Sequence, residues 1–284
     1  MKKLFIAALS LCSFFAGAQK LDNSLLWKIS GNGLSQPSYL FGTIHITCDA
    51  TLDQDVLNAL DTTSQLYLEL DMDNPGLQME MMGGMVMKDG KTMSAMVSPE
   101  DFALLDKFLQ ENAGMGAKMM DRFKPFMITS LLLPRMLECP MQSVEMELMK
   151  VSKAQGEETL GLETVQDQLA VFDAIPYEEQ MAELMKAVKD NLVTEKAELK
   201  KMLAMYKAKD LNKLLELMEE SENKIYNQHN DVLLANRNKN WIPKIEAIAK
   251  ETPTFFGVGA AHLGGEDGVI MLLRKKGYKV EAVK

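Results

Sequence analysis

The chain has 284 residues, of which 47% are apolar, and it carries 31 basic against 40 acidic side chains. This apolar share is enough for a folded core, and the length allows one large domain or two small ones. The net charge of −9 argues against nucleic acid or an anionic membrane surface as a partner.

The first eighteen residues have the pattern of a signal peptide. Two lysines precede the apolar run Leu4–Phe15, which is too short to span a bilayer, and Ala-Gly-Ala at 16–18 suits cleavage before Gln19. The alternatives are a short membrane anchor and a lipid attached at Cys12, where the bulky Leu11 departs from the usual small residue. The prediction is an exported chain, periplasmic or secreted, with 29 basic and 40 acidic side chains and no later membrane span.

Short apolar runs and helical patterns then alternate along the chain. The predicted strands are Leu25–Ile29, Tyr39–Ile46, Leu66–Leu70 and Thr254–Val258, with weaker candidates for a sheet edge at Leu160–Leu162 and Tyr278–Val283. The predicted helices are Asp53–Asp61, Pro99–Asn112, Lys118–Glu138, Gln142–Gln155, Pro176–Tyr206, Leu211–Glu222, Gln228–Lys250 and Leu263–Lys276. Pro125 and Pro134 should break or kink the third of these helices.

The strands cluster at the two ends of the chain, and the helices fill the middle. The C-terminal strands must then join the N-terminal strands in one sheet. The sequence therefore predicts a single α/β domain over residues 19–284, with a central mixed sheet and a long helical insertion at roughly 99–250.

The segment Met72–Met96 contains eight of the 23 methionines, with Gly83, Gly84 and Gly90 among them. Methionine is flexible and fills irregular gaps, so the favoured interpretation is a mobile loop packed over apolar surface. An adaptable lid over an apolar or peptide substrate is the second interpretation, and a thioether copper site is the third.

Two cysteines follow the predicted leader, Cys48 and Cys139. An oxidising compartment permits a disulfide between them, but a spacing of 91 residues does not show whether they meet. A disulfide and two buried free thiols are equally compatible with the sequence.

The strongest functional signal is a repeated tetrapeptide. Two of the three histidines close a Gly-x-x-His pattern, Gly42 to His45 and Gly259 to His262, and each motif follows an apolar run. Each glycine would let the backbone turn tightly as its strand ends. Each histidine would then lie near the carboxyl end of a strand, where open α/β sheets bind ligands. Backbone N–H groups of the helix that follows His262 could hold an anion.

A metal site at this pair needs carboxylate partners. Glu69 is the first candidate, because Leu66–Leu70 alternates and places Glu69 and Asp71 on the face opposite the leucines. Glu163 is a second carboxylate, at a strand-to-helix junction, and Arg237 could bind a substrate carboxylate or stabilise developing negative charge. Taken singly, each of these residues has an ordinary structural interpretation, and the third histidine, His229, is interpreted as a core or surface residue rather than a ligand.

The order of these motifs resembles the TraB/PrgY/GumN family, which is related to the Tiki Wnt-inactivating proteases and to the EreA/ChaN-like fold. The matching segments are Leu26–Ile29, Tyr39–His45, Leu68–Asp71, Asp89–Thr92, Gly161–Thr164, Arg237-Asn238-x-x-Trp241 and Gly257–Gly265. The resemblance implies an α/β fold in which both Gly-x-x-His motifs converge with a strand glutamate. Ala261 departs from the family, where relatives often have glycine before the histidine.

In the Tiki branch, the resemblance implies metal-dependent proteolysis. Carried over, His45, His262 and Glu69 become the predicted ligands of a divalent metal ion, with Glu69 or Glu163 as general base and Arg237 in support. The metal would lower the pKa of its bound water towards ~7. The leading hypothesis is therefore a secreted metal-dependent hydrolase of peptide or amide bonds.

Other function classes stay open. A non-enzymatic protein that sequesters a peptide signal or a haem-like ligand is the alternative, and a structural envelope protein is a third possibility. The chain contains neither a His-Glu-x-x-His helix nor a Gly-x-Ser-x-Gly elbow, so a conventional zincin and a serine hydrolase are not supported.

Overall fold

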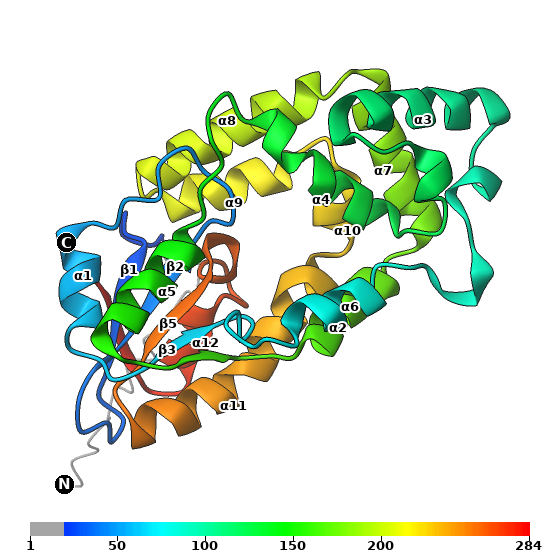
Figure 1. Cartoon of the computed structure of the whole chain (residues 1–284). Helices are drawn as coiled ribbons and strands as arrows, with labels where there is room; N and C mark the ends of the chain where they lie inside the picture. Colours follow the sequence, from blue (N-terminus) through cyan, green and yellow to red (C-terminus); the bar gives the residue numbers. More distant parts are fainter. Residues whose placement is uncertain (1–19) are drawn as a thin grey trace, which may run out of the picture.

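The computed structural model describes residues 20–284, so the predicted signal peptide at 1–18 lies outside the described residues. Six strands form one mixed sheet in the order β4-β3-β5-β2-β1-β6 (Figure 1). Their bounds are β1 Leu26–Ser30, β2 Ser38–Thr43, β3 Leu66–Leu68, β4 Thr159–Gly161, β5 Phe255–Gly259 and β6 Lys279–Ala282. The predicted α/β fold is confirmed, and the two weaker predicted strands, β4 and β6, are the two edges of the sheet.

The pairing of the strands decides where a site can form. β4, β3, β5 and β2 run parallel to one another, whereas β1 pairs antiparallel with both β2 and β6. β5 lies in the middle, and its Phe255, Phe256 and Val258 are fully buried, as expected for a parallel strand covered on both faces. Four carboxyl ends therefore meet at one edge of the sheet.

The helices lie on both sides of the sheet and beyond this edge (Figure 1). Their bounds are α1 Gln54–Leu60, α2 Leu77–Gly83, α3 Pro99–Ala113, α4 Pro125–Met136, α5 Val144–Gln155, α6 Val165–Ala174, α7 Tyr177–Lys189, α8 Val193–Lys207, α9 Leu211–Glu219, α10 Lys224–Gln228, α11 Asn236–Glu251 and α12 Val269–Lys275. A π turn, η4 (Asp231–Ala235), leads into α11, and a 3-10 turn, η5 (Ala260–His262), follows β5. No helix within residues 20–284 combines the length and apolar character that a membrane crossing requires.

Several predicted helices differ in their bounds. The predicted helix Pro176–Tyr206 is two helices, because Asn191 and Leu192 adopt left-handed backbone with φ of 59° and 61° and end α7. The predicted break before Pro125 is confirmed, since α4 begins at that proline, and Pro134 stays inside the helix. The prediction that a helix starts at Leu263 is wrong, because α12 begins only at Val269.

α6 and α2 lie outside every predicted helix. α6 begins with a capping box in which the Thr164 and Asp167 side chains and backbone N–H groups bond reciprocally. α2 lies in the methionine-rich segment, so this segment is partly folded rather than a plain loop. Met87 and Met93 of the segment are buried, whereas Met79 on α2 is 80% exposed.

Two large apolar cores and one small cluster, around Met127, Val165 and Leu169, stabilise the described part of the chain. The sheet core surrounds β1–β6 and includes Leu148 of α5 and Trp241 of α11. The helical core joins α3, α4, α7 and α8 and contains the fully buried Leu105 and Leu132. Since β4 lies between α5 and α6, the chain returns once to the sheet within the predicted insertion at roughly 99–250.

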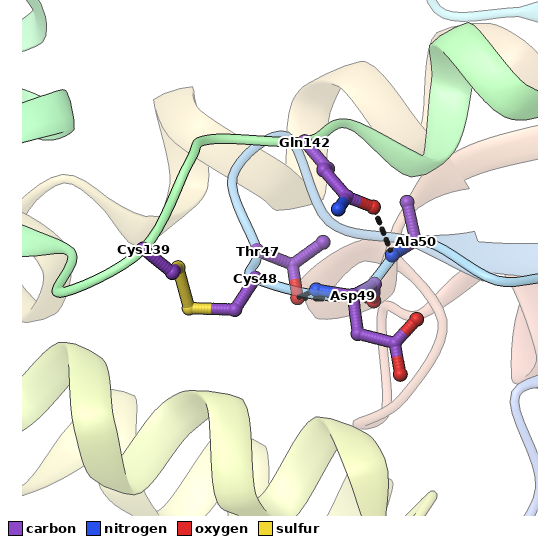
Figure 2. The surroundings of a disulfide bond; sticks show 6 residues. All are labelled: Thr47, Cys48, Asp49, Ala50, Cys139 and Gln142. Carbon is purple, nitrogen blue, oxygen red and sulfur yellow. Dashed lines mark hydrogen bonds between the residues drawn. A yellow bond between two sulfur atoms is a disulfide. The ribbon is translucent and has the colours of Figure 1, made fainter.

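A disulfide joins Cys48, in the loop after β2, to Cys139, in the segment between α4 and α5 (Figure 2). Their Cα atoms lie 5.6 Å apart, within the range that disulfides span. The question that the sequence leaves open is therefore resolved in favour of the disulfide.

The helical core offers a test of its contribution to stability. Leu132→Ala should lower the free energy of unfolding by about 2–5 kcal/mol, since it leaves a cavity around a side chain that is fully buried. The adjacent Leu131 is 42% exposed, so Leu131→Ala should change it by less than about 0.5 kcal/mol. Urea denaturation followed by circular dichroism measures both, and equal losses would contradict the assignment of this core.

Candidate active site

Four side chains singled out in the sequence come from the carboxyl ends of the four parallel strands. His45 follows β2, Glu69 directly follows β3, Glu163 follows β4, and His262 closes the turn η5 after β5. The structure therefore brings them to the same edge of the sheet. Arg237, near the start of α11, reaches this edge from a different part of the chain.

Arg237 is the centre of a buried cluster. Its Nη2 lies 2.6 Å from Glu69 Oε2 and 2.5 Å from Glu163 Oε1, and its Nε donates to Glu163 Oε2 at 3.3 Å. Its Nη1 donates to His262 Nε2 at 3.0 Å and to a backbone carbonyl at 3.1 Å. A guanidinium has five N–H donors, and all five are engaged here. In this state Arg237 holds the cluster together, and the substrate-binding role predicted from sequence stays untested.

Trp241 lies one helical turn after Arg237 and closes the cluster from the side of α11. Its Nε1 donates to Glu163 Oε2 at 3.1 Å. Its ring centroid lies 4.9 Å from the Arg237 guanidinium carbon and 4.5 Å from the His262 ring. The indole therefore fixes one carboxylate and covers one side of the guanidinium.

Other groups of the protein pack closely against the two motif glycines. Glu69 Oε1 accepts from the Gly259 N–H at 2.8 Å, and a Cβ at Gly259 would lie 3.2 Å from that oxygen. A Cβ at Gly42 would lie 3.1 Å from the Ala260 Cα. Neither glycine is among the residues with positive φ. Left-handed backbone is therefore not what requires glycine here, although Gly259 does end β5 directly before the turn η5. Both positions admit a close neighbour, a carboxylate at Gly259 and the Ala260 turn at Gly42.

His262 is buried and its tautomer follows from its partners. Arg237 can only donate, so Nε2 must carry the lone pair and Nδ1 the proton, which is donated to Asn238 Oδ1 at 2.6 Å. The Asn238 amide nitrogen donates to the backbone oxygen of Asp267 at 2.9 Å, which leaves its oxygen for the ring. His262 is thus a neutral imidazole held at both nitrogens.

His45 has a different environment. Its side chain is 69% exposed, and its Nδ1 lies 2.7 Å from Oε1 of Glu145, which is only 5% exposed. Ser143 Oγ donates to the other oxygen of Glu145 at 2.7 Å. Within residues 20–284 no hydrogen bond joins His45 to the Arg237 cluster, yet the charges of Glu69 and Arg237 both change the pKa of His45. The ring therefore lies within electrostatic reach of the cluster.

The environments separate the pKa values of the cluster. Burial alone would raise the pKa of the Glu69 carboxyl, but positive charge beside it lowers the pKa to about 2. This charge comes first from His262 in its protonated form, then from Arg237 and His45. Since burial lowers the pKa of His262 to about 3 in spite of Glu69, Arg237 and His45 supply the charge at neutral pH. The buried cluster therefore contains an ionised Glu69 and a neutral His262 at physiological pH.

The exposed histidine shifts in the opposite direction. The hydrogen bond to Glu145 raises the pKa of His45 to about 9, against the opposing effect of desolvation. Burial would raise the pKa of Glu145, but the hydrogen bond and the charge of His45 lower it. His45 and Glu145 therefore form an imidazolium–carboxylate pair at neutral pH.

A divalent metal ion does not fit the side chains as they are arranged. Both imidazoles are anchored through Nδ1, which is the arrangement that metal-binding histidines use. However, His262 Nε2 and Glu69 Oε1 are 3.7 Å apart and Arg237 bonds to both residues. In the described part of the chain no three His, Cys, Asp or Glu side chains gather where they could hold a metal.

A cavity of about 540 Å³ adjoins the cluster between α6 and α11. Glu163, Arg237 and Trp241 form its inner wall, and Val171 and Lys244 are among the other lining residues. A small molecule or a peptide side chain could therefore approach the outer face of the Arg237–Glu163 ion pair.

Four residues that hold the site receive no role from the sequence: Glu145 and Gln168, which the sequence does not single out, and Asn238 and Trp241, which stand only in the matching motif. Gln168 donates to Glu69 Oε2 at 3.2 Å. Asn238 and Trp241 stand one and four positions after Arg237, so helical spacing could have placed them beside it. Glu145 had no such signal. His229 pairs with Glu179 at 2.7 Å, away from these contacts, as its ordinary interpretation suggests.

The model of the TraB/PrgY/gumN family matches residues 25–282, which include both Gly-x-x-His motifs and all the residues of the cluster. The chain belongs to this family. No solved structure matches the chain.

Two curated relatives are similar over most of the chain. Metalloprotease TIKI2 of Danio rerio is 21% identical over 320 residues, which cover 93% of this chain. Metalloprotease TIKI1 of Danio rerio is 21% identical over 313 residues, which cover 91% of it. The matches cover only 62% and 63% of the relatives' own lengths, so this chain spans about three fifths of each.

The ion pairs of Arg237 should be needed for the fold itself. Arg237→Gln leaves two buried carboxylates without a cation and should lower the free energy of unfolding by about 3–5 kcal/mol. Arg237→Lys should recover only part of this loss, because an ammonium cannot bond two carboxylates in parallel forks. Thermal and urea denaturation measure both variants.

The control is Lys239→Gln on the same helix, whose ion pair with Asp267 is about half exposed on both sides. It should cost less than about 1 kcal/mol. If Arg237→Gln were as stable as this control, the ion-pair cluster would not hold the site together.

Proposed function

We propose that this protein is an exported hydrolase of peptide or amide bonds, with its site at the carboxyl edge of β2, β5, β3 and β4. The observation that carries the proposal is the convergence of both Gly-x-x-His motifs with Glu69, Glu163 and Arg237 at this edge. The family membership and the metalloprotease names of the two relatives support the reaction class.

His45 is the proposed proton donor to the leaving nitrogen. Its ring is exposed, its Nδ1 is anchored on Glu145, and its Nε2 has no partner among residues 20–284. A substrate can therefore reach the free nitrogen, and Glu145 keeps the ring oriented while the proton leaves.

Glu69 is the proposed base, which takes a proton from the attacking water, and Arg237 is the group that stabilises the oxyanion. As it stands, Glu69 is a weak base, because the pKa of its carboxyl is about 2. A substrate carbonyl that draws Arg237 away from Glu69 would raise this pKa and direct the guanidinium at developing negative charge. Binding of substrate thereby frees the base. Meanwhile the two hydrogen bonds to Glu163 keep the guanidinium within the site.

The test is cleavage of a peptide library by the purified protein and its variants. His45→Gln and Glu69→Gln should each lower kcat/KM by about 10²–10⁴-fold, the usual contribution of a positioned acid or base. His229→Gln, a histidine paired with Glu179 elsewhere, should change it by less than about twofold. Cleavage that survives both site variants would contradict the proposal.

A divalent metal ion bound by His45, His262 and Glu69 remains a prediction of the sequence. Binding would require Arg237 to leave His262 Nε2, because that lone pair already accepts from the guanidinium. Arg237→Gln should therefore bind Mn²⁺ or Zn²⁺ at least about tenfold more tightly than the wild type, since it removes a competing cation. Titration calorimetry and elemental analysis measure this.

The control is the double variant with Arg237→Gln and His262→Gln, which should lose the added affinity. Equal metal binding by the wild type, Arg237→Gln and this double variant would show that His262 is not a metal ligand.

A second candidate function is binding without chemistry. Two observations favour it. The engaged Arg237 donors leave none free for a developing oxyanion, and the adjoining cavity offers room for a peptide signal or a haem-like ligand. Stoichiometric ligand binding with no turnover of a peptide library would favour this candidate over the hydrolase.

The proposed export has one structural support besides the leader sequence. Disulfides persist in oxidising compartments such as the periplasm and the extracellular space. The Cys48–Cys139 disulfide is consistent with that location.

A further inference from the structure

We infer that the Cys48–Cys139 disulfide and the adjacent Thr47–Gln142 bridge form a brace that positions His45 against Glu145. The inference rests on the proposed function, because it assigns positioning residues to that reaction. The brace consists of Thr47, Cys48, Cys139 and Gln142.

Two irregular segments run antiparallel through the brace. Thr47 and Gln142 exchange both backbone hydrogen bonds, at 3.0 Å and 2.9 Å, and the Gln142 side-chain oxygen accepts from Ala50 N–H at 3.0 Å (Figure 2). The disulfide lies beside this bridge, at Cys48 and Cys139.

The same pair of segments carries the candidate catalytic histidine and its partner. Val144 N–H donates to Ile44 O at 3.3 Å, and the next residues on each segment are His45 and Glu145. His45 precedes Cys48 by three positions, and Glu145 follows Gln142 by three. The brace therefore lies at one end of a short ladder, and the His45–Glu145 pair lies at the other.

This pair needs an external constraint because a single hydrogen bond, His45 Nδ1 to Glu145 Oε1 at 2.7 Å, fixes only one end of the ring. Glu145 is buried and held by Ser143, but the His45 side chain is 69% exposed and bonds through Nδ1 alone among residues 20–284. The position of the ring therefore follows the backbone of its loop. A displacement of about 1 Å between the two segments is enough to cost an active site roughly 10²-fold in rate.

Without the disulfide, that loop has few ties to Glu145. The bonded cysteines are separated by 91 residues, so no local turn keeps the two segments together. The remaining ties are three backbone hydrogen bonds, the Gln142–Ala50 bond and the His45–Glu145 contact itself. They lie near the surface, where Cys48 and Gln142 are exposed and water competes. The disulfide is the covalent tie between the segments.

The experiment follows the His45 Nδ1–H by NMR in protein labelled with [¹⁵N]histidine, which contains only three histidines. The samples are wild type, wild type reduced by a dithiol, and the double variant Cys48→Ser with Cys139→Ser. In the reduction, the dithiol gives two electrons and two protons to the cysteine sulfurs and itself closes to a disulfide. His45→Gln assigns the signal.

We expect the His45 Nδ1–H to exchange with water at least about tenfold faster in the reduced protein and in the double variant. The His262 Nδ1–H, which is bonded to Asn238, should keep its position and thereby report an intact fold. In peptide cleavage, kcat should fall by about 10–100-fold while KM changes by less than about twofold.

Unchanged exchange of the His45 proton in both samples would overturn the inference, whatever the activity. If the wild type cleaved no peptide, the proposed function would fail, and the NMR comparison would still decide whether the brace positions the ring. If the double variant lost the His262 signal, Gln142→Pro makes the same test, since it keeps the disulfide and removes the N–H that bonds Thr47. Gln142→Ala, which keeps that N–H, is its control.

Discussion

Two carboxylates, Glu69 and Glu163, lie buried at the ends of adjacent parallel strands, where like charges would repel and water is excluded. A single guanidinium between them makes this arrangement possible, because Arg237 bonds to both. The two carboxylates in turn raise the pKa of Arg237, although burial lowers it. Removing the cation would leave an uncompensated buried charge, which is among the most destabilising changes in a protein interior. The other parts of the site are arranged around this ion pair.

The order of the strands explains which groups Arg237 can reach. Along the sheet edge the order β4-β3-β5-β2 places Glu163, Glu69, His262 and His45 in sequence. Arg237 contacts the first three directly. His45 is the fourth, across β5 from Glu69, and its Nδ1 is taken by Glu145 from α5. One sheet edge thus carries a shared ion-pair cluster and a separate histidine–carboxylate pair.

Much of this could be predicted from the sequence, and the reasons are physical. Strand alternation and the position of the Gly-x-x-His motifs place Glu69, His45 and His262 at strand ends, because parallel strands finish at a common edge. The identity of the partners could not be predicted in the same way. Glu145 lies 100 residues from His45, and nothing in its local pattern distinguishes it from other first-turn glutamates of a helix. Helix bounds also depended on single residues, such as Leu192 in left-handed backbone.

The repeated motif suggests two equivalent histidines, and the structure gives them opposite environments. His262 is buried, accepts from a cation and is neutral, whereas His45 is exposed, bonds to a carboxylate and is protonated. Pairs of titratable groups whose surroundings separate their pKa values are how one site supports both acid and base steps. The glycines explain the repeat without requiring equal roles, since each admits a close neighbour, Glu69 in one case and the Ala260 turn in the other. The repeat therefore records a shared packing requirement at two strand ends, and the chemistry of each histidine depends on the partner that another element supplies.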